Sequence, residues 1–169
     1  MNNQKKTTVF LVQAAVIAAL YAALTLFLAP ISFSGNQFRV AEALTLLPVL
    51  TPAAIPGLAV GCIIGNITSP YGIVDIIFGT CATLLAAICT RLTKNIRIKG
   101  LPVLSAVFPV IFNALIIGAE ITFLASEGFQ WRAFVLTAAS VGFGEIVVCF
   151  LLGLPMCAAI EKIKIFKKG

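Results

Sequence analysis

The chain has 169 residues, of which 60% are hydrophobic and only 11% are charged, and its mean hydropathy is +1.09. Soluble domains carry about 25% charged residues, so this composition excludes an ordinary soluble protein and indicates a chain that lies mostly in lipid. The net charge of +6 does not indicate binding to nucleic acid, because the basic residues flank apolar segments instead of forming one solvated face.

Apolar segments long enough for membrane spans follow one another along the chain. A transmembrane helix needs about 20 mostly apolar residues. The first segment exceeds the apolar part of a cleaved signal peptide, about 7–15 residues, and we expect it to stay as a helix. The second contains Pro48, Pro52 and Pro56 and forms either one kinked helix or two short ones. The segments cover residues 9–29, 40–67, 73–92, 101–125 and 133–160.

The basic residues decide between one kinked helix and two short ones. Lys5 and Lys6 precede the first segment, and further basic residues lie at 91–99, between the third segment and the fourth. The positive-inside rule puts both groups in the cytoplasm, so the chain crosses an even number of times between them. We therefore predict short helices at about 38–49 and 53–66, sheltered by their neighbours.

The complete prediction is an all-α integral membrane protein with six transmembrane helices and both termini in the cytoplasm. We expect residues 1–169 to form a single transmembrane domain. Basic cytoplasmic tails cover about 1–8 and 161–169.

Polar side chains inside the apolar segments are the candidate binding residues. A charged group at the membrane centre costs about 2.5 kcal/mol or more and therefore indicates a function. The predicted topology puts most of these side chains in the outer half of the membrane, with Asn113 and Glu145 near its middle. We expect them to line a cavity open to the outside. The candidates for substrate binding are Arg39, Glu42, Asn66, Asp75, Asn113, Glu120 and Glu145.

Structural roles are alternatives for some of these side chains. Arg39 and Glu42 have the spacing of an ion pair on one face of a helix. Asp75 stands where a helix cap is expected, and Asn66 where a helix ends.

Small residues indicate close helix contacts at two places. Gly142 and Gly144 precede Glu145 and leave space beside it, either for a flat ligand or for a closely packed helix. The first segment carries two rows of alanines at four-residue spacing, a pattern that lets helices approach closely in lipid. We expect these rows to dock against a separate subunit, and packing within the chain is the alternative. The rows are Ala14, Ala18 and Ala22, and beside them Ala15, Ala19 and Ala23.

The sequence lacks the motifs of familiar catalytic and metal sites. It contains no histidine, and its five cysteines lie in apolar segments without C-x-x-C spacing, which favours buried packing over zinc or redox roles. It also contains no G-x-x-x-x-G-K-[ST] loop for ATP. We therefore predict no enzyme, no metal and no cofactor, and a chain that cannot drive transport alone. A membrane-embedded enzyme with bare carboxylates, or an accessory subunit, is the alternative from another class.

Several ordered motifs resemble the QueT family, from the first helix to the last. This family comprises predicted queuosine-precursor transporters, which are substrate-binding S components of energy-coupling factor (ECF) systems. The motifs are FRVAEALTLLP at 38–48, LTPAAIPG at 50–57, GN at 65–66, DIIFG at 75–79, AT at 82–83, FNA at 112–114, GAE at 118–120 and GFGE at 142–145.

The resemblance implies a six-helix S-component bundle in a bacterial cell membrane, with a ligand site near the outer face. It also implies that the alanine face of the first helix docks onto an ECF transmembrane coupling subunit carried by two ATPases, which alone use ATP. The implied ligands are 7-deazaguanine bases, namely queuine or its 7-cyano or 7-aminomethyl precursor. An S component for a flavin, thiamine or folate is the alternative within the same fold.

The implied ligand suggests roles for the polar candidates. A carboxylate accepts paired N–H groups of a guanine-like edge, and we expect this role for one of Glu42, Glu120 and Glu145. Asn113 or Arg39 would donate to the ligand carbonyl, and another carboxylate would neutralise an aminomethyl cation. The candidate aromatic stacking partners are Phe38, Phe78 and Phe112. The candidate lids, chosen by their position alone, are residues 25–37 and 68–72.

Overall fold

The computed structural model describes residues 3–32, 38–125 and 130–163, and this part of the chain is built of helices joined by turns, as predicted. A 3₁₀ helix and a π segment interrupt the α-helical pattern. The elements are α1 (Asn3–Phe27), α2 (Ala29–Ser32), the 3₁₀ helix η1 (Val40–Val49), α3 (Ala54–Gly65), the 3₁₀ turn η2 (Asn66–Thr68), α4 (Ile73–Leu92), α5 (Val103–Ala125), α6 (Trp131–Ile146), the π segment η3 (Val147–Gly153) and α7 (Leu154–Ile163).

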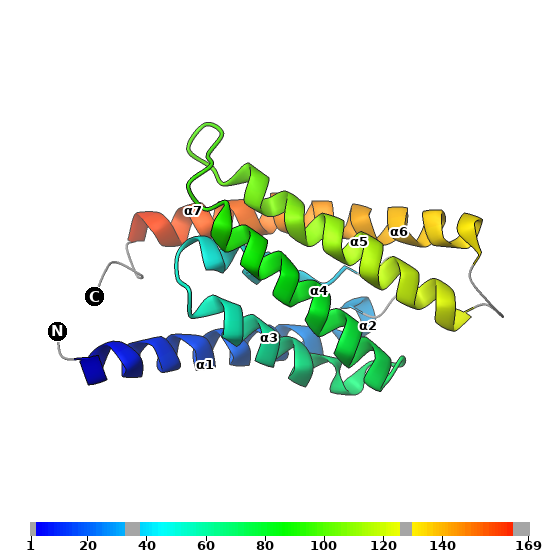
Figure 1. Cartoon of the computed structure of the whole chain (residues 1–169), viewed down its shortest axis with the longest axis horizontal. Helices are drawn as coiled ribbons and strands as arrows, with labels where there is room; N and C mark the ends of the chain where they lie inside the picture. Colours follow the sequence, from blue (N-terminus) through cyan, green and yellow to red (C-terminus); the bar gives the residue numbers. More distant parts are fainter. Residues whose placement is uncertain (1–2, 33–37, 126–129, 164–169) are drawn as a thin grey trace.

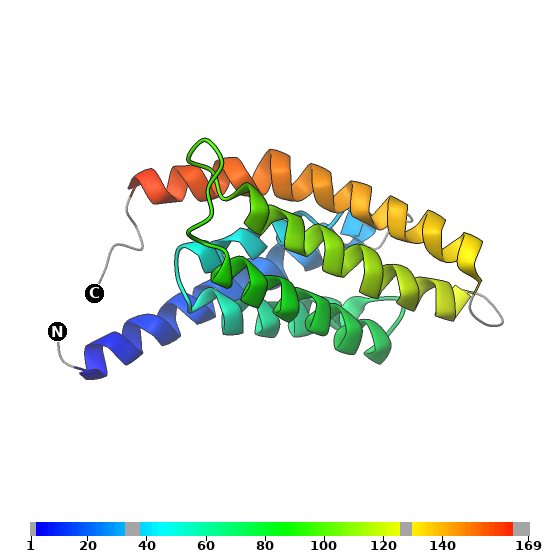
Figure 2. The same ribbon diagram turned by 45° about the horizontal axis from the view of Figure 1, so that its top comes forward.

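The helices run back and forth along the long axis of the molecule (Figure 1). Six passes are formed by α1, η1, α3 with η2, α4, α5 and the continuous rod of α6, η3 and α7. The start of α1, the end of α7, the turn between η1 and α3 and the loop between α4 and α5 lie at one end in both views (Figures 1 and 2). We call this the basic end, because Lys5, Lys6 and the basic residues of 91–99 lie there.

Four of the passes are long and apolar enough to cross a membrane: Asn3–Phe27, Ile73–Leu92, Val103–Ala125 and Trp131–Ile163. The segment 40–67 forms two short helices, η1 and α3, which confirms that prediction. At about 2.0 Å per residue, the ten residues of η1 span about 20 Å, less than the roughly 30 Å of a hydrocarbon core.

The helix η1 forms the centre of the molecule. Every residue from Ala41 to Val49 is buried, and α1, α3, α4, α5, η3 and α7 all contact it. Its last carbonyls have a partner from α4, because Arg91 Nη1 donates to the oxygens of Pro48 and Val49 at 3.0 and 3.3 Å. The expectation of short helices sheltered by neighbours therefore holds for η1.

Glycines of α3 allow α1 to approach very closely. A Cβ atom at Gly57 would lie 2.7 Å from the carbonyl oxygen of Ala14, and one at Gly61 would lie 2.7 Å from Tyr21 Cβ. Gly65 repeats the pattern one turn later. The four-residue spacing of these glycines is the pattern that permits backbone contact between membrane helices.

The two alanine rows of α1 therefore have different surroundings. Ala18 and Ala22 are 7% and 6% exposed and face α3, so packing within the chain describes this row. The neighbouring row is exposed and remains available to a partner, and its docking role stays a prediction. The exposed row comprises Ala15, Ala19 and Ala23.

The segments expected as tails and lids are partly helical. The helix α1 already begins at Asn3, and α7 includes Glu161 and Lys162. Of the candidate lid 25–37, residues 25–27 belong to α1 and 29–32 to α2, whereas 33–37 lie outside the described residues. The second candidate, 68–72, comprises the last residue of η2 and the turn that leads to α4.

Candidate functional site

A buried ion pair joins the start of η1 to the first turn of α4. Arg39 Nη2 lies 3.0 and 2.9 Å from the Oδ1 and Oδ2 atoms of Asp75, and the two side chains are 4% and 1% exposed. An acidic residue in the first turn also suits the positive end of the helix dipole. We call Arg39, Asp75 and Asn66 the ion-pair network, because Asn66 Nδ2 donates to the backbone oxygen of Asp75 at 2.9 Å.

The structural alternatives for these residues have mixed outcomes. Asn66 does end α3, as its C-cap, but its side chain also reaches across to α4. The N-cap of α4 is Gly72, without a side-chain hydrogen bond, so capping by Asp75 is wrong. The ion pair that Arg39 forms joins it to Asp75, on a different helix.

Gly79 is a residue of this network that the sequence prediction missed. A Cβ atom at Gly79 would lie 2.5 Å from Asn66 Nδ2 and 3.3 Å from Asp75 Oδ1. A glycine one turn after Asp75 therefore leaves the space in which the Asn66 amide meets α4. The four-residue spacing of Asp75 and Gly79 was the available signal, because it puts both on one face of a helix.

A second buried group lies deeper, and we call Glu42, Asn113 and Glu145 the carboxylate cluster. Their side chains come from η1, α5 and α6 and are 0%, 3% and 2% exposed. Asn113 lies close to both carboxylates. Side chains far apart in the chain thus meet in the interior, whereas the prediction had put Glu42 nearer the outside, and the expected cavity open to the outside stays a prediction.

One carboxylate oxygen of Glu42 accepts hydrogen bonds from neighbouring side chains, and the other accepts none from the described residues. The hydroxyl of Tyr21 donates to its Oε1 atom, and Thr83 Oγ1 donates to the same oxygen at 3.4 Å. Within the described residues, Glu42 Oε2 and Asn113 Nδ2 have no hydrogen-bond partner. One acceptor and one donor of the cluster thus lie buried without a well-formed hydrogen bond, although the Asn113 amide is close enough to both carboxylates to interact with them.

Tyr21, Thr83 and Cys149 support this cluster and were missed from the sequence. Cys149 Sγ donates to Glu145 Oε2 at 3.6 Å, from the π segment one turn after the glutamate. Tyr21 is fully buried in the apolar part of α1, between Gln13 and Thr25. A single buried tyrosine in a membrane span was a usable signal, because its hydroxyl needs a partner there.

Glu120 stands apart from the carboxylate cluster. It is 4% exposed and lines a cavity of about 230 Å³ between α4 and α5, together with Phe78. Both of its carboxylate oxygens lack a hydrogen-bond partner among the described residues. Asp75 and Arg39 are its charged neighbours.

The three predicted stacking residues have three different surroundings. Phe38 packs edge-on against Phe143, with ring centroids 6.4 Å apart. Phe112 stacks on Phe108 at 6.5 Å. Phe78 is 46% exposed and lines the cavity beside Glu120.

Gly142 supports the packing alternative. A Cβ atom at this position would lie 3.3 Å from Ala114 Cβ, so the glycine faces α5 and not an open space. No group of three or more histidine, cysteine or acidic side chains in 3–32, 38–125 and 130–163 is arranged to hold a metal ion.

The fold and the site together define a multi-pass helical membrane protein with polar groups gathered in its interior. Comparison with known families specifies it further: the family model described as QueT transporter matches residues 11–162. The chain belongs to this family, which confirms the resemblance seen in the sequence. The family is one of transporters and not of enzymes, as predicted.

A curated relative agrees with this family. The protein named "Queuosine precursor transporter QueT" from Lactococcus lactis subsp. cremoris (strain MG1363) is 37% identical over 84 residues. The match covers 48% of this chain and 49% of the relative, so it spans about half of that protein's length. No solved structure matches.

Proposed function

We propose that this chain is the substrate-binding subunit of an ECF-type importer for queuosine precursors. It captures a 7-deazaguanine base outside the cell and delivers it through a separate module driven by two ATPases. Membership of the QueT family supports this assignment, and so does the name of the Lactococcus relative, which describes a queuosine precursor transporter.

The unmatched atoms of the carboxylate cluster carry the proposal. Leaving a buried polar group unpaired costs about 1–3 kcal/mol, so Glu42 Oε2 and Asn113 Nδ2 favour a polar ligand between them. A guanine-like edge offers N–H donors next to a carbonyl oxygen, which is the complement of a carboxylate beside an amide. Within this proposal Glu42 accepts from the N–H edge and Asn113 donates to the carbonyl.

Asn113 is preferred to Arg39 for the carbonyl because the guanidinium of Arg39 already binds Asp75. Glu145, which also lies close to Asn113, completes the acceptor side of the cluster. Glu120 is the carboxylate for a cationic aminomethyl group, since it lies away from the cluster.

The arrangement of the ends supports six membrane crossings with both termini in the cytoplasm. The start of α1, the end of α7, Lys5, Lys6 and the basic residues of 91–99 all lie at the basic end (Figure 1), as the positive-inside rule requires. The short passes η1 and α3 cross as well, because the long helices around η1 keep its backbone away from lipid.

The exposed alanine row of α1 supports docking of a coupling subunit. Beside this row an apolar groove of about 410 Å³ runs between α1 and α7, with Val16 and Leu20 on one wall and Met156 and Ile160 on the other. A smooth row next to an apolar groove suits a second membrane helix.

Equilibrium binding to the purified chain in detergent tests the ligand. Queuine and its 7-cyano and 7-aminomethyl precursors are titrated, with guanine and riboflavin as controls. We expect saturable binding of a 7-deazaguanine and none of riboflavin. Tight binding of riboflavin, or binding of no compound in the panel, would contradict the queuosine assignment.

A matched pair of substitutions tests the docking surface. Ala19→Leu changes the exposed row and should weaken co-purification with the coupling subunit while ligand binding is kept. Ala18→Leu adds the same bulk against α3 and should lower the melting temperature instead. Equal loss of docking and ligand binding in Ala19→Leu would contradict a separate docking face.

A further inference from the structure

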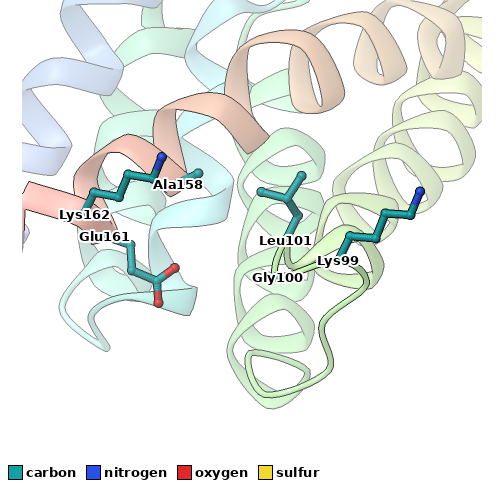
Figure 3. A pocket seen from close by; sticks show the side chains of 6 residues that line it. All are labelled: Lys99, Gly100, Leu101, Ala158, Glu161 and Lys162. Carbon is teal, nitrogen blue, oxygen red and sulfur yellow. The ribbon is translucent and has the colours of Figure 1, made fainter.

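A cleft of about 530 Å³ lies at the basic end, between the loop that joins α4 to α5 and the last turns of α7 (Figure 3). Its volume is in the range of small-molecule pockets, about 300–1,000 Å³, and is large for a single ion. The lining residues are Lys99, Gly100, Leu101, Ala158, Glu161 and Lys162.

Arg97 neutralises the one carboxylate that lines the cleft. Its Nη1 and Nη2 atoms donate to the two oxygens of Glu161 at 2.7 and 2.9 Å. These hydrogen bonds raise the pKa of Arg97, which is therefore charged at all working pH values. The charge of Glu161 is thus matched within the protein.

The same arginine helps to hold the loop in shape. Arg97 Nη1 also donates to the backbone oxygen of Gly100 at 3.1 Å. Lys99 and Gly100 adopt left-handed backbone angles, with φ of 52° and 82°, so a tight turn ends at the cleft. The position of Lys99 beside α7 therefore depends on a defined turn.

Lys99 and Lys162 give the cleft a positive charge. Figure 3 shows Lys99 and Lys162 on either side of Leu101 and Ala158. Neither lysine forms an ion pair with an acidic side chain in the part of the chain that the structure describes. Both lysines are exposed, and in Figure 3 the Lys99 side chain points away from Leu101, so an anion on this apolar floor meets both ammonium groups when the side chains turn inward.

Exposed isoleucines indicate that this cleft lies at the lipid surface. Ile96 and Ile98 alternate with Arg97 and Lys99 in the loop and are 52% and 56% exposed. Ile163, at the end of α7, is 68% exposed. Apolar side chains next to basic ones are typical of segments that rest on the headgroup region of a bilayer.

We propose that this cleft binds the headgroup of an anionic phospholipid. The phosphate lies between Lys99 and Lys162, and the start of the acyl chains contacts Leu101 and Ala158. Basic pockets between membrane helices at a cytoplasmic surface have this chemistry. The inference is independent of the substrate site, which lies in the interior.

Native mass spectrometry of the full chain released from mixed micelles tests the proposal. Phosphatidylglycerol and phosphatidylcholine with identical acyl chains are compared on the wild type, on Lys99→Gln with Lys162→Gln, and on Lys5→Gln with Lys6→Gln. The last variant removes the same charge from the same end but outside the cleft.

We expect retained phosphatidylglycerol on the wild type and on the control, and about thirtyfold weaker binding to the cleft variant, since each basic group contributes roughly a factor of five. Equal retention of the two lipids, or equal loss in both variants, would overturn the proposal. Displacement of the lipid by low-millimolar inorganic phosphate would instead assign the cleft to a soluble anion and also overturn it.

A further variant has an expected effect of opposite sign. Glu161→Gln, at an exposed helix end, frees Arg97 from its carboxylate partner, and we expect Arg97 to keep its hydrogen bond to Gly100 and the loop its shape. We therefore expect phosphatidylglycerol to bind several times more tightly. Weaker binding in this variant would contradict the charge arrangement proposed for the cleft.

Discussion

The ion-pair network and the carboxylate cluster are both buried, but their hydrogen bonding differs. In the network, Asp75 binds Arg39 through both carboxylate oxygens and Asn66 through its backbone oxygen, and the unmatched atom within the described part of the chain is the amide oxygen Oδ1 of Asn66. In the cluster, Glu42 Oε2 and Asn113 Nδ2 lack a partner among the described residues. The carboxylate of Asp75 thus has a cationic partner that joins two helices, whereas Glu42 forms no ion pair among the described residues, so the two regions should respond differently to substitution.

The largest effect is expected for Asp75→Ala. Breaking a buried ion pair costs about 3–5 kcal/mol, because it leaves the partner charge in the interior. Thermal unfolding in detergent should show a large loss of stability whether or not a ligand is present. The control is Glu161→Ala, which breaks the exposed pair with Arg97 and should cost less than about 1 kcal/mol. Similar losses in the two variants would show that the buried network does not stabilise the fold.

Glu42→Gln should separate binding from stability. The substitution keeps the shape of the side chain but replaces the acceptor oxygen Oε2 by an N–H donor, and a donor or acceptor left without its partner costs about 1–3 kcal/mol. We expect roughly tenfold to hundredfold weaker binding of the 7-deazaguanine ligand, with little change in melting temperature. Full affinity in this variant would assign the N–H edge of the ligand to another carboxylate.

Gly79→Ala tests the close approach within the ion-pair network. The added Cβ atom meets Asn66 Nδ2 at 2.5 Å, and overpacking of this kind costs about 1–3 kcal/mol. The matched control is Gly142→Ala, whose Cβ atom meets Ala114 Cβ at 3.3 Å and should be tolerated better. The melting temperatures of the two variants are compared. An equal decrease in both would show that Gly79 has no special role in the ion-pair network.

The smallest effect is expected for Glu120→Gln, and it depends on the ligand. If Glu120 neutralises an aminomethyl cation, the variant should bind the 7-aminomethyl precursor roughly fivefold more weakly and the neutral 7-cyano precursor with unchanged affinity. Isothermal titration with both ligands measures this ratio. An equal loss for the two would point to a general effect on the site and against a role in charge recognition.

Most of the fold could be predicted from the sequence. Hydropathy located the long spans, and the charges at Lys5, Lys6 and 91–99 required two helices in the segment 40–67, where the structure has η1 and α3. These features are local, because a peptide group in lipid must find its hydrogen bonds within its own helix.

The candidate site could be predicted only as a set of residues. The sequence singled out every member of the network and the cluster except the small or supporting ones, such as Gly79, Tyr21 and Thr83. It did not show that Arg39 pairs with Asp75, 36 positions later in the chain, or that Glu42 and Glu120 belong to different surroundings.

The sequence by itself determined that this protein is a helical membrane protein of the QueT family, since apolar segments, flanking charges and ordered motifs are properties of the chain alone. Only the tertiary structure decided which alanine row of α1 faces α3 and which stays exposed. The reason is that the rotation of a helix about its axis depends on the shapes of its neighbours. Here the glycines of α3 accept one face of α1 and turn the other outward.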